Sequence, residues 1–194
     1  ISKTSYEWIV ILDHDDICFP DRLEKYNNYI NLNNKIDLYF SDMVYFNDHK
    51  SFLRFEKQFK KNQAPYNLNL NKNFGYYNLV QYGCFIGSSS VAFKKSKYYR
   101  TSGFKKEYKF LSDYIFFLEL AEIGNFFCIK TPLVKWRMHE NQSTEVNNQL
   151  YMNEMMNLYS NLYFKKDIRL LLKIKLIIRH FILFLKSINL KLKN

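Results

Sequence analysis

The chain has 194 residues, of which 47% are hydrophobic and 24% charged, so it can form one packed domain with a short appendage and is not a disordered polymer. The 5 glycines and 3 prolines are too few for a collagen-like or linker-like chain, and the 3 widely spaced cysteines support neither a disulfide framework nor a zinc knuckle. The net charge is +11, but residues 165–194 hold nine basic residues and one acid, which makes +8; the body is therefore nearly neutral, and this disfavours nucleic-acid binding.

The chain begins with elements typical of an α/β domain. Residues 6–12 are apolar and β-branched and predict a buried strand, which a polar turn follows at 13–19. Pro20 suits the first turn of a helix that runs to about residue 31. Apolar residues at helical spacing predict the buried face of this helix, namely Leu23, Tyr26 and Ile30.

The middle of the chain predicts two strands separated by a long variable segment. Residues 37–46 predict a strand that is interrupted near Ser41 and Asp42. Residues 47–75 show little periodicity and many Asn and Lys, so we expect a long loop with local helix. Residues 84–93 predict a further strand, with small residues at its centre.

The alternation of helix and strand continues in the second half. Residues 111–123 predict a helix that Ser112 could cap, and two short strands are expected at 125–129 and 133–136. Residues 145–164 predict a helix rich in Met and Leu. Because strands and helices alternate along the chain, the predicted fold class is α/β.

The basic C-terminal segment predicts an amphipathic helix over residues 165–186. On a helical projection its Lys and Arg residues fall within one half, and Leu, Ile and Phe gather on the other half. No uninterrupted apolar stretch approaches the roughly 18–20 residues that span a bilayer. We therefore expect this helix to lie on an anionic membrane surface. The alternative is a helix that packs on the protein's own core or on a partner chain.

The most informative segment is the acidic turn, residues 13–16, which follows the first predicted strand. Its three carboxylates, on Asp13, Asp15 and Asp16, repel one another unless a cation neutralises them. Mg²⁺ or Mn²⁺ binds one or two such oxygens and completes its shell with water and phosphate. The pattern therefore indicates a metal-bridged phosphate ligand at the end of a strand. The alternative is a solvated turn whose aspartates cap the next helix.

Three blocks of the sequence together point to a known family. The first block reads EWIVILDHDDICFPDRLEKY, the second GSSSVAFKKSKYYRTSGF, and the third FLSDYIFFLELAEIGNFFCIKTPLVKWRMHENQST. In order and spacing, over roughly residues 5–144, these blocks resemble the family 2 glycosyltransferases with the GT-A fold. The resemblance implies a Rossmann-like mixed, mostly parallel sheet flanked by helices over residues 1–144, followed by a helical extension over 145–194.

The same resemblance implies roles for the acidic turn. Asp15 would be a direct metal ligand, and Asp13 would contact the ribose of the nucleotide or the water shell of the metal. Asp16 would support the loop. Arg137 and His139 match an Arg-x-His element that approaches the diphosphate or completes the metal site.

A further carboxylate would act on the acceptor. Asp113 lies where the family has its catalytic base, although the usual Glu-Asp pair is Ser112-Asp113 in this chain. With the metal on one side of the sugar and this base on the other, a single displacement with inversion at the anomeric carbon is expected. The structural alternative for Asp113 is a helix cap.

The resemblance implies a glycosyltransferase of the hexosyltransferase type that uses a nucleotide-sugar donor and Mg²⁺ or Mn²⁺. The acceptor would be a glycan or a lipid-linked oligosaccharide in bacterial cell-surface polysaccharide synthesis. With the basic helix on the membrane, the protein would be cytoplasmic and peripheral on the inner face of the cytoplasmic membrane.

The chain opens directly beside the acidic turn, and nothing in it matches the nucleotide-binding strand and turn that begin the family's domain. We therefore expect an N-terminally truncated domain with an incomplete donor site and little activity of its own. Two other functions stay open. One is an inactive remnant that serves as a membrane-bound scaffold. The other is a haloacid-dehalogenase-like phosphatase, although that motif requires Thr or Val where Ile17 stands.

Overall fold

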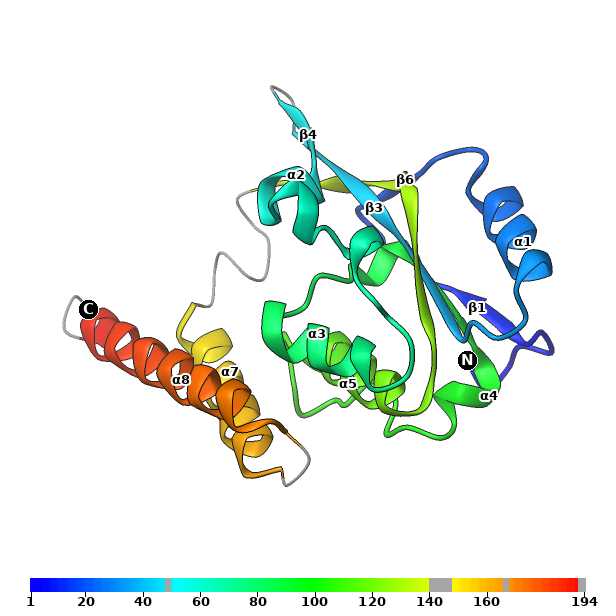
Figure 1. Cartoon of the computed structure of the whole chain (residues 1–194). Coiled ribbons are helices and arrows are strands. Elements are labelled where there is room, and N and C mark those ends of the chain that lie inside the picture. Colours follow the sequence, from blue (N-terminus) through cyan, green and yellow to red (C-terminus); the bar gives the residue numbers. More distant parts are fainter. Residues whose placement is uncertain (48–49, 140–147, 166–167, 192–194) are drawn as a thin grey trace. The chain divides into compact units, whose positions relative to one another are not determined.

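The computed structural model describes residues 1–47, 50–139, 148–165 and 168–191, and the chain divides into two compact units (Figure 1). The first unit comprises residues 1–104 and 114–139, and the second comprises 105–113 and 140–194. The predicted boundary at 144/145 lies outside the described residues. Residues 105–113, which the sequence analysis placed in the first domain, group with the C-terminal helices.

The first unit is built on a six-stranded mixed sheet. Its strands are β1 (Trp8–Val10), β2 (Ile17–Cys18), β3 (Leu38–Phe46), β4 (Ser51–Leu53), β5 (Val91–Lys94) and β6 (Phe126–Arg137). The strand order is β1-β5-β3-β6-β2, and β4 pairs with β3.

The directions of these strands confirm the α/β class but not the predicted arrangement. Only β3 and β6 pair in parallel, whereas the other four pairings of the described strands are antiparallel. The expectation of a mostly parallel sheet is therefore wrong. The reason is that β5 lies between β1 and β3 and runs opposite to both, while the short strands β2 and β4 fold back on β6 and β3.

Helices lie on both faces of this sheet. The helices of the first unit are α1 (Arg22–Leu32), α2 (Arg54–Gln58), α3 (Phe74–Tyr82), α4 (Lys95–Tyr98) and α5 (Ser112–Ile123), the last of which begins in the segment that groups with the second unit. Figure 1 shows α1 on one side of the sheet and α3 and α5 on the other. This layering buries both faces of β3, whose first six residues are all buried.

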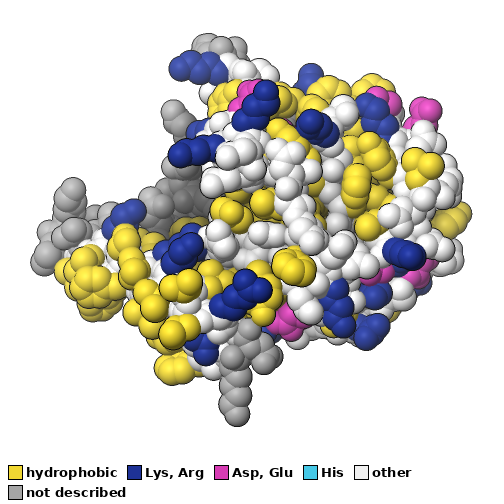
Figure 2. All heavy atoms as spheres, in the orientation of Figure 1, with side chains coloured by type: hydrophobic (Ala, Val, Ile, Leu, Met, Phe, Trp, Pro, Cys, Tyr) yellow, Lys and Arg dark blue, Asp and Glu magenta, His cyan; other side chains and the backbone are white. Residues whose placement is uncertain are grey.

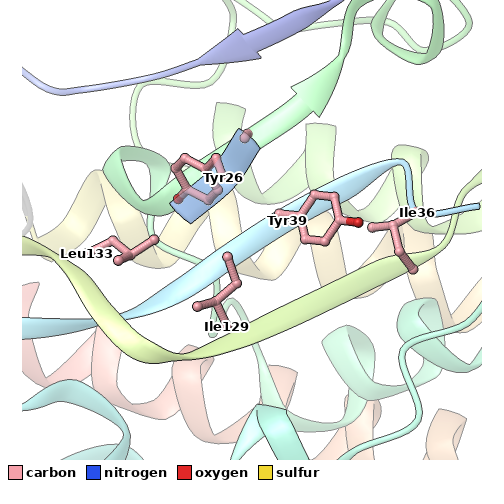
Figure 3. Packing of buried hydrophobic residues seen from close by; sticks show 6 residues of the cluster. Tyr26, Ile36, Tyr39, Ile129 and Leu133 are labelled. Carbon is pink, nitrogen blue, oxygen red and sulfur yellow. The ribbon is translucent and has the colours of Figure 1, made fainter. Parts of the chain in front are cut away.

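The core consists of aromatic and branched side chains that alternate along the strands. On the face that α1 covers, Tyr26 packs with Tyr39, Ile129 and Leu133 (Figure 3). On the opposite face the ring of Phe93 meets that of Phe116 in α5, with 5.0 Å between ring centroids. Because side chains alternate between the faces of a strand, β3 supplies Tyr39 to one layer and its neighbours to the other.

Two strands differ from their predictions for physical reasons. The strand predicted at 6–12 forms but is shorter and less buried than expected, because only Trp8–Val10 form β1, which pairs with β5 at the edge of the sheet and leaves Val10 37% exposed. The two strands predicted at 125–129 and 133–136 form one strand, β6, whose pairing with β3 is irregular between Ser41 and Met43. The predicted interruption near Ser41 and Asp42 is not found, because β3 runs unbroken from Leu38 to Phe46 and only its pairing with β6 is irregular there.

Two other segments also differ from the sequence analysis. In α1 the predicted residues Tyr26 and Ile30 do pack in the core, but Leu23 is exposed and Arg22 is buried instead. Of the strand predicted at 84–93, only the end forms β5, and a 3₁₀ turn, η3 (Ser88–Ser90), precedes it. The helix α3 was not predicted.

A buried carboxylate lies beside this irregular pairing of β3 and β6. Asp42 is 3% exposed, and its Oδ1 accepts hydrogen bonds from the amides of Met43 (2.7 Å) and Phe55 (3.3 Å). Burial raises the pKa of Asp42 to about 6, although these two hydrogen bonds and the charge of Arg54 act in the opposite direction. The folded chain therefore binds a proton at Asp42 more tightly than the unfolded chain does.

The wild type is expected to lose free energy of unfolding as pH rises because Asp42 ionises, and the Asp42→Asn variant is expected not to show this loss. The folded pKa of about 6 lies above the ordinary aspartate value of 3.8, so the wild-type free energy of unfolding falls as pH rises between these values. We expect the variant to gain about 1–2 kcal/mol on the wild type between pH 4 and pH 7.5. Urea unfolding followed by Trp fluorescence measures this, with the exposed Asp21→Asn as the control. An equal difference at both pH values would contradict it.

The second unit contains a pair of antiparallel helices, α7 (Asn148–Phe164) and α8 (Leu170–Lys191). Gln149 near the start of α7 donates to the hydroxyl of Ser187 near the end of α8 (2.7 Å), and the ring of Tyr163 lies 6.0 Å from that of His180. Both helices agree with the predicted helical extension. No helix in the part of the chain that the structure describes is long and apolar enough to cross a membrane.

Candidate active site at the acidic turn

Two serines that are distant in the sequence but lie beside the acidic turn in the first unit hold it in place. A backbone hydrogen bond from Asp16 to Asp13 (3.2 Å) closes the turn directly after β1. The amide of Asp13 donates to the hydroxyl of Ser89 (2.9 Å), and the hydroxyl of Ser88 donates to the Asp13 carboxylate. The η3 turn thus fixes both the backbone and the side chain of Asp13.

A buried arginine ties these two turns together. Arg22, in the first turn of α1, is 2% exposed. Its Nη2 donates to the carbonyl oxygens of Ile11 (2.6 Å) and Ser89 (2.5 Å), one on each side of the site. Its guanidinium also lies over the ring of Tyr26, 5.5 Å from the centroid. Arg22 therefore satisfies carbonyl groups that the ends of the strands leave unpaired.

The end of β6 meets the other side of the acidic turn. Nε2 of His139 lies 3.2 Å from Oδ2 of Asp15, and Nε of Arg137 donates to the backbone carbonyl of Asp15 (3.2 Å). The amide of Arg137 donates to Oδ1 of Asp16 (3.1 Å). These contacts join residues more than 120 positions apart in the sequence.

The carboxylates of the turn have different proton affinities. Partial burial acts to raise the pKa of Asp15, but the hydrogen bond from His139, its own backbone amide and the charges of His14 and His139 together lower this pKa below its ordinary value. Burial raises the pKa of Asp16, and the charges of Asp13 and Asp15 add to this effect. Of Asp15 and Asp16, Asp15 is thus the carboxylate that more readily stays ionised.

The donor set of the turn suits a hard divalent cation held by few protein groups. Among the described residues, no three His, Cys, Asp or Glu side chains converge on one point. Oδ2 of Asp16 is nevertheless buried, and no donor among the described residues forms a hydrogen bond to it. The hydroxyl of Ser89 lies near enough to favour the ionised form of this carboxylate. Asp15 and His139 offer oxygen and imidazole ligands. Mg²⁺ and Mn²⁺ accept such sets when water and phosphate supply the other positions.

The remaining predicted site residue, Asp113, lies in the second unit at the start of α5. The segment before it is anchored by Glu154 of α7, a buried carboxylate that accepts hydrogen bonds from the amides of Lys109 (2.8 Å), Phe110 (2.9 Å) and Leu111 (3.1 Å). The carboxylate of Glu154 lies at the N-terminus of α5, where the helix dipole also favours a negative charge. Glu154 thus fixes the entry to the helix turn that carries Asp113.

The structure brings together five of the six predicted site residues, Asp13, Asp15, Asp16, Arg137 and His139, in the first unit. The residues that fix the position of these five were not predicted from the sequence. Arg22 follows the Pro-Asp of the first block, and Ser88 and Ser89 lie in the small-residue run of the second, but only the folded chain shows which atoms they contact.

Comparison with known proteins adds no further assignment. No model of a known protein family matches this chain, and no curated protein matches it.

Proposed function

We propose that the chain carries the catalytic part of a metal-dependent, inverting glycosyltransferase of the GT-A type, as in family 2. The observation that carries the proposal is the meeting of the acidic turn with Arg137 and His139 at the end of β6. These residues belong to two separate blocks of the family resemblance. A solvated capping turn needs no such contacts, since a helix cap is satisfied locally.

The acidic turn would bind the diphosphate of the donor through a divalent cation. Asp15 and His139 would hold Mg²⁺ or Mn²⁺, which when bound stabilises the negative charge that develops on the departing nucleoside diphosphate. Asp13, whose carboxylate Ser88 orients, would contact the ribose or the water shell of the cation. Arg137 adds a positive charge beside three carboxylates, which offsets part of their repulsion of an anionic ligand.

Asp113 would act as the general base. In the proposed reaction the acceptor hydroxyl loses its proton to the Asp113 carboxylate while its oxygen forms a bond to the anomeric carbon. The bond from that carbon to the diphosphate oxygen breaks, and its electron pair leaves with the nucleoside diphosphate. This single displacement inverts the anomeric carbon. A base of this kind contributes about 10²–10⁴-fold to the rate.

The acceptor we propose is a bacterial surface glycan or a lipid-linked oligosaccharide, and the place of the reaction is the inner face of the cytoplasmic membrane. The strongly basic C-terminal segment supports this location, because anionic lipids attract clustered Lys and Arg.

Replacing Asp15 with Asn is expected to weaken Mn²⁺-dependent binding of a nucleoside diphosphate strongly. Titration calorimetry of the full chain against uridine, guanosine and other nucleoside diphosphates should show binding of at least one of them only when Mn²⁺ is present. The variant should weaken this binding about 100-fold, since an amide replaces the ionised ligand oxygen.

The matched control is Glu24→Gln, which changes an exposed carboxylate in the first turn of α1 and should leave binding unchanged. Binding that is equally strong without Mn²⁺, or in the Asp15 variant, would contradict the proposed role of the acidic turn. Release of phosphate from a simple phosphoester, lost on Asp13→Asn, would instead favour the phosphatase. Absence of all binding would favour the scaffold.

A further inference from the structure

The helix α8 has two apolar faces, and only one of them is packed. Toward α7 it buries Leu172, Leu176 and Ser187. The opposite face carries apolar residues at helical spacing that remain exposed, namely Leu170, Leu171, Ile174, Ile177, Ile178, Phe181, Ile182, Phe184, Leu185 and Ile188. Phe181 is 60% exposed and Leu171 77%. Figure 2 shows hydrophobic side chains gathered along this helix with Lys and Arg beside them. So long an exposed apolar face requires a covering surface.

Cations border this exposed face on both sides. With about 100° between successive residues, Lys175 and Lys186 fall along one border of the face and Lys173 along the other. No Asp or Glu occurs in the sequence from Leu170 to Lys191. An apolar face with cations at both borders matches a lipid layer, in which acyl chains lie beneath anionic headgroups. Long Lys side chains reach the headgroups while their methylene groups stay in the apolar region.

We infer that this exposed face of α8 is a docking surface for an anionic phospholipid membrane, with the helix lying in the plane of the interface. A second copy of the chain fits the face less well, because it would bring the lysines at the borders of one helix against those of the other, with no acidic partner on either helix. The inference is independent of the proposed glycosyl transfer, since it depends on α8 alone.

Co-sedimentation of the full chain with vesicles tests this surface. Binding is expected to vesicles of phosphatidylglycerol and phosphatidylcholine in equal parts, and to fall by at least about tenfold on vesicles of phosphatidylcholine alone. The variant Lys175→Gln, Lys186→Gln should lose about 10- to 30-fold in partition coefficient, at about fivefold per cation. The variant Ile178→Ser, Phe181→Ser should lose at least about tenfold even at low salt, because it removes apolar area from the buried face.

The control is Lys60→Gln, Lys61→Gln, which removes the same charge from exposed positions in the first unit and should bind as the wild type does. Circular dichroism verifies that all variants stay helical, which is expected because the changed side chains are exposed. Vesicle binding that the control loses as strongly as the α8 variants would overturn the inference. A chain that binds no vesicles would also overturn the inference. This holds both for a chain that is monomeric in analytical ultracentrifugation and for a dimer that the apolar variant dissociates.

Discussion

Replacing Arg22 with Met is expected to lower the free energy of unfolding of the first unit by about 2–4 kcal/mol. The guanidinium donates to the carbonyls of Ile11 and Ser89, so its removal leaves two acceptors at the site without this donor. Each unsatisfied buried acceptor costs about 1–3 kcal/mol, partly offset because a buried charge no longer has to be desolvated. The methionine keeps most of the apolar contact with Tyr26, so the loss reports mainly on the hydrogen bonds.

The measurement is urea unfolding followed by the fluorescence of Trp8 and Trp136, both of which belong to the first unit. Arg22→Lys is the partial control, because an ammonium can reach one carbonyl but lacks the fork of the guanidinium. Arg100→Met, at an exposed position, should be nearly neutral. If Arg22→Met proved as stable as the wild type, the acidic turn would not depend on this side chain. The Mn²⁺-dependent binding proposed above should weaken together with stability.

The parts of the fold that depend on local pattern were predictable. The helix over residues 111–123 and the helices of the C-terminal extension follow from apolar periodicity; the structure confirms α5 and α7 within one to three residues of the expected ends, whereas α8 begins and ends five residues later than expected. The acidic turn was also visible, since its three carboxylates lie within four positions.

The direction of strands and the partners of side chains were not predictable in this way. Alternation of apolar residues gives no direction of pairing, so β5 could not be assigned its antiparallel neighbours. In α1 the pattern placed Leu23 inside, yet Arg22 is buried there because unpaired carbonyls attract its guanidinium. The helix α3 contains Gly75 and weak helix formers, and it is held by tertiary contacts such as the hydrogen bond from the Tyr114 hydroxyl to the Leu79 carbonyl (2.8 Å).

The same limit applies to α8. A helical projection separates basic from apolar positions, but it cannot divide the apolar residues between a packed face and an exposed one. That division requires a neighbouring helix. In the structure α7 packs on α8, Leu172 and Leu176 are buried, and Ile178 and Phe181 stay exposed. The proposed membrane surface is therefore one defined face of α8 and no longer the basic segment as a whole.

Replacing Glu154 with Ala is expected to destabilise the second unit by about 3 kcal/mol, because three amide donors lose a charged acceptor at once. The carboxylate is 6% exposed and accepts from three consecutive amides, those of Lys109, Phe110 and Leu111, about 45 positions before it. Amide hydrogen exchange measured by mass spectrometry should show faster exchange in residues 109–111 and at the start of α5. Glu154→Gln should lose less, since its carbonyl oxygen still accepts.

This substitution separates two explanations of Asp113. The matched control is Asn157→Ala, one helical turn away on the exposed side of α7, which should leave exchange unchanged because alanine favours helix. If Glu154 serves only as a helix anchor, Glu154→Gln should alter exchange without altering any transfer activity that the chain displays. If it also positions the proposed base, kcat should fall while KM for the donor stays constant, because the acidic turn proposed to bind the donor belongs to the first unit. Unchanged exchange in Glu154→Ala would show that the three hydrogen bonds do not hold this segment.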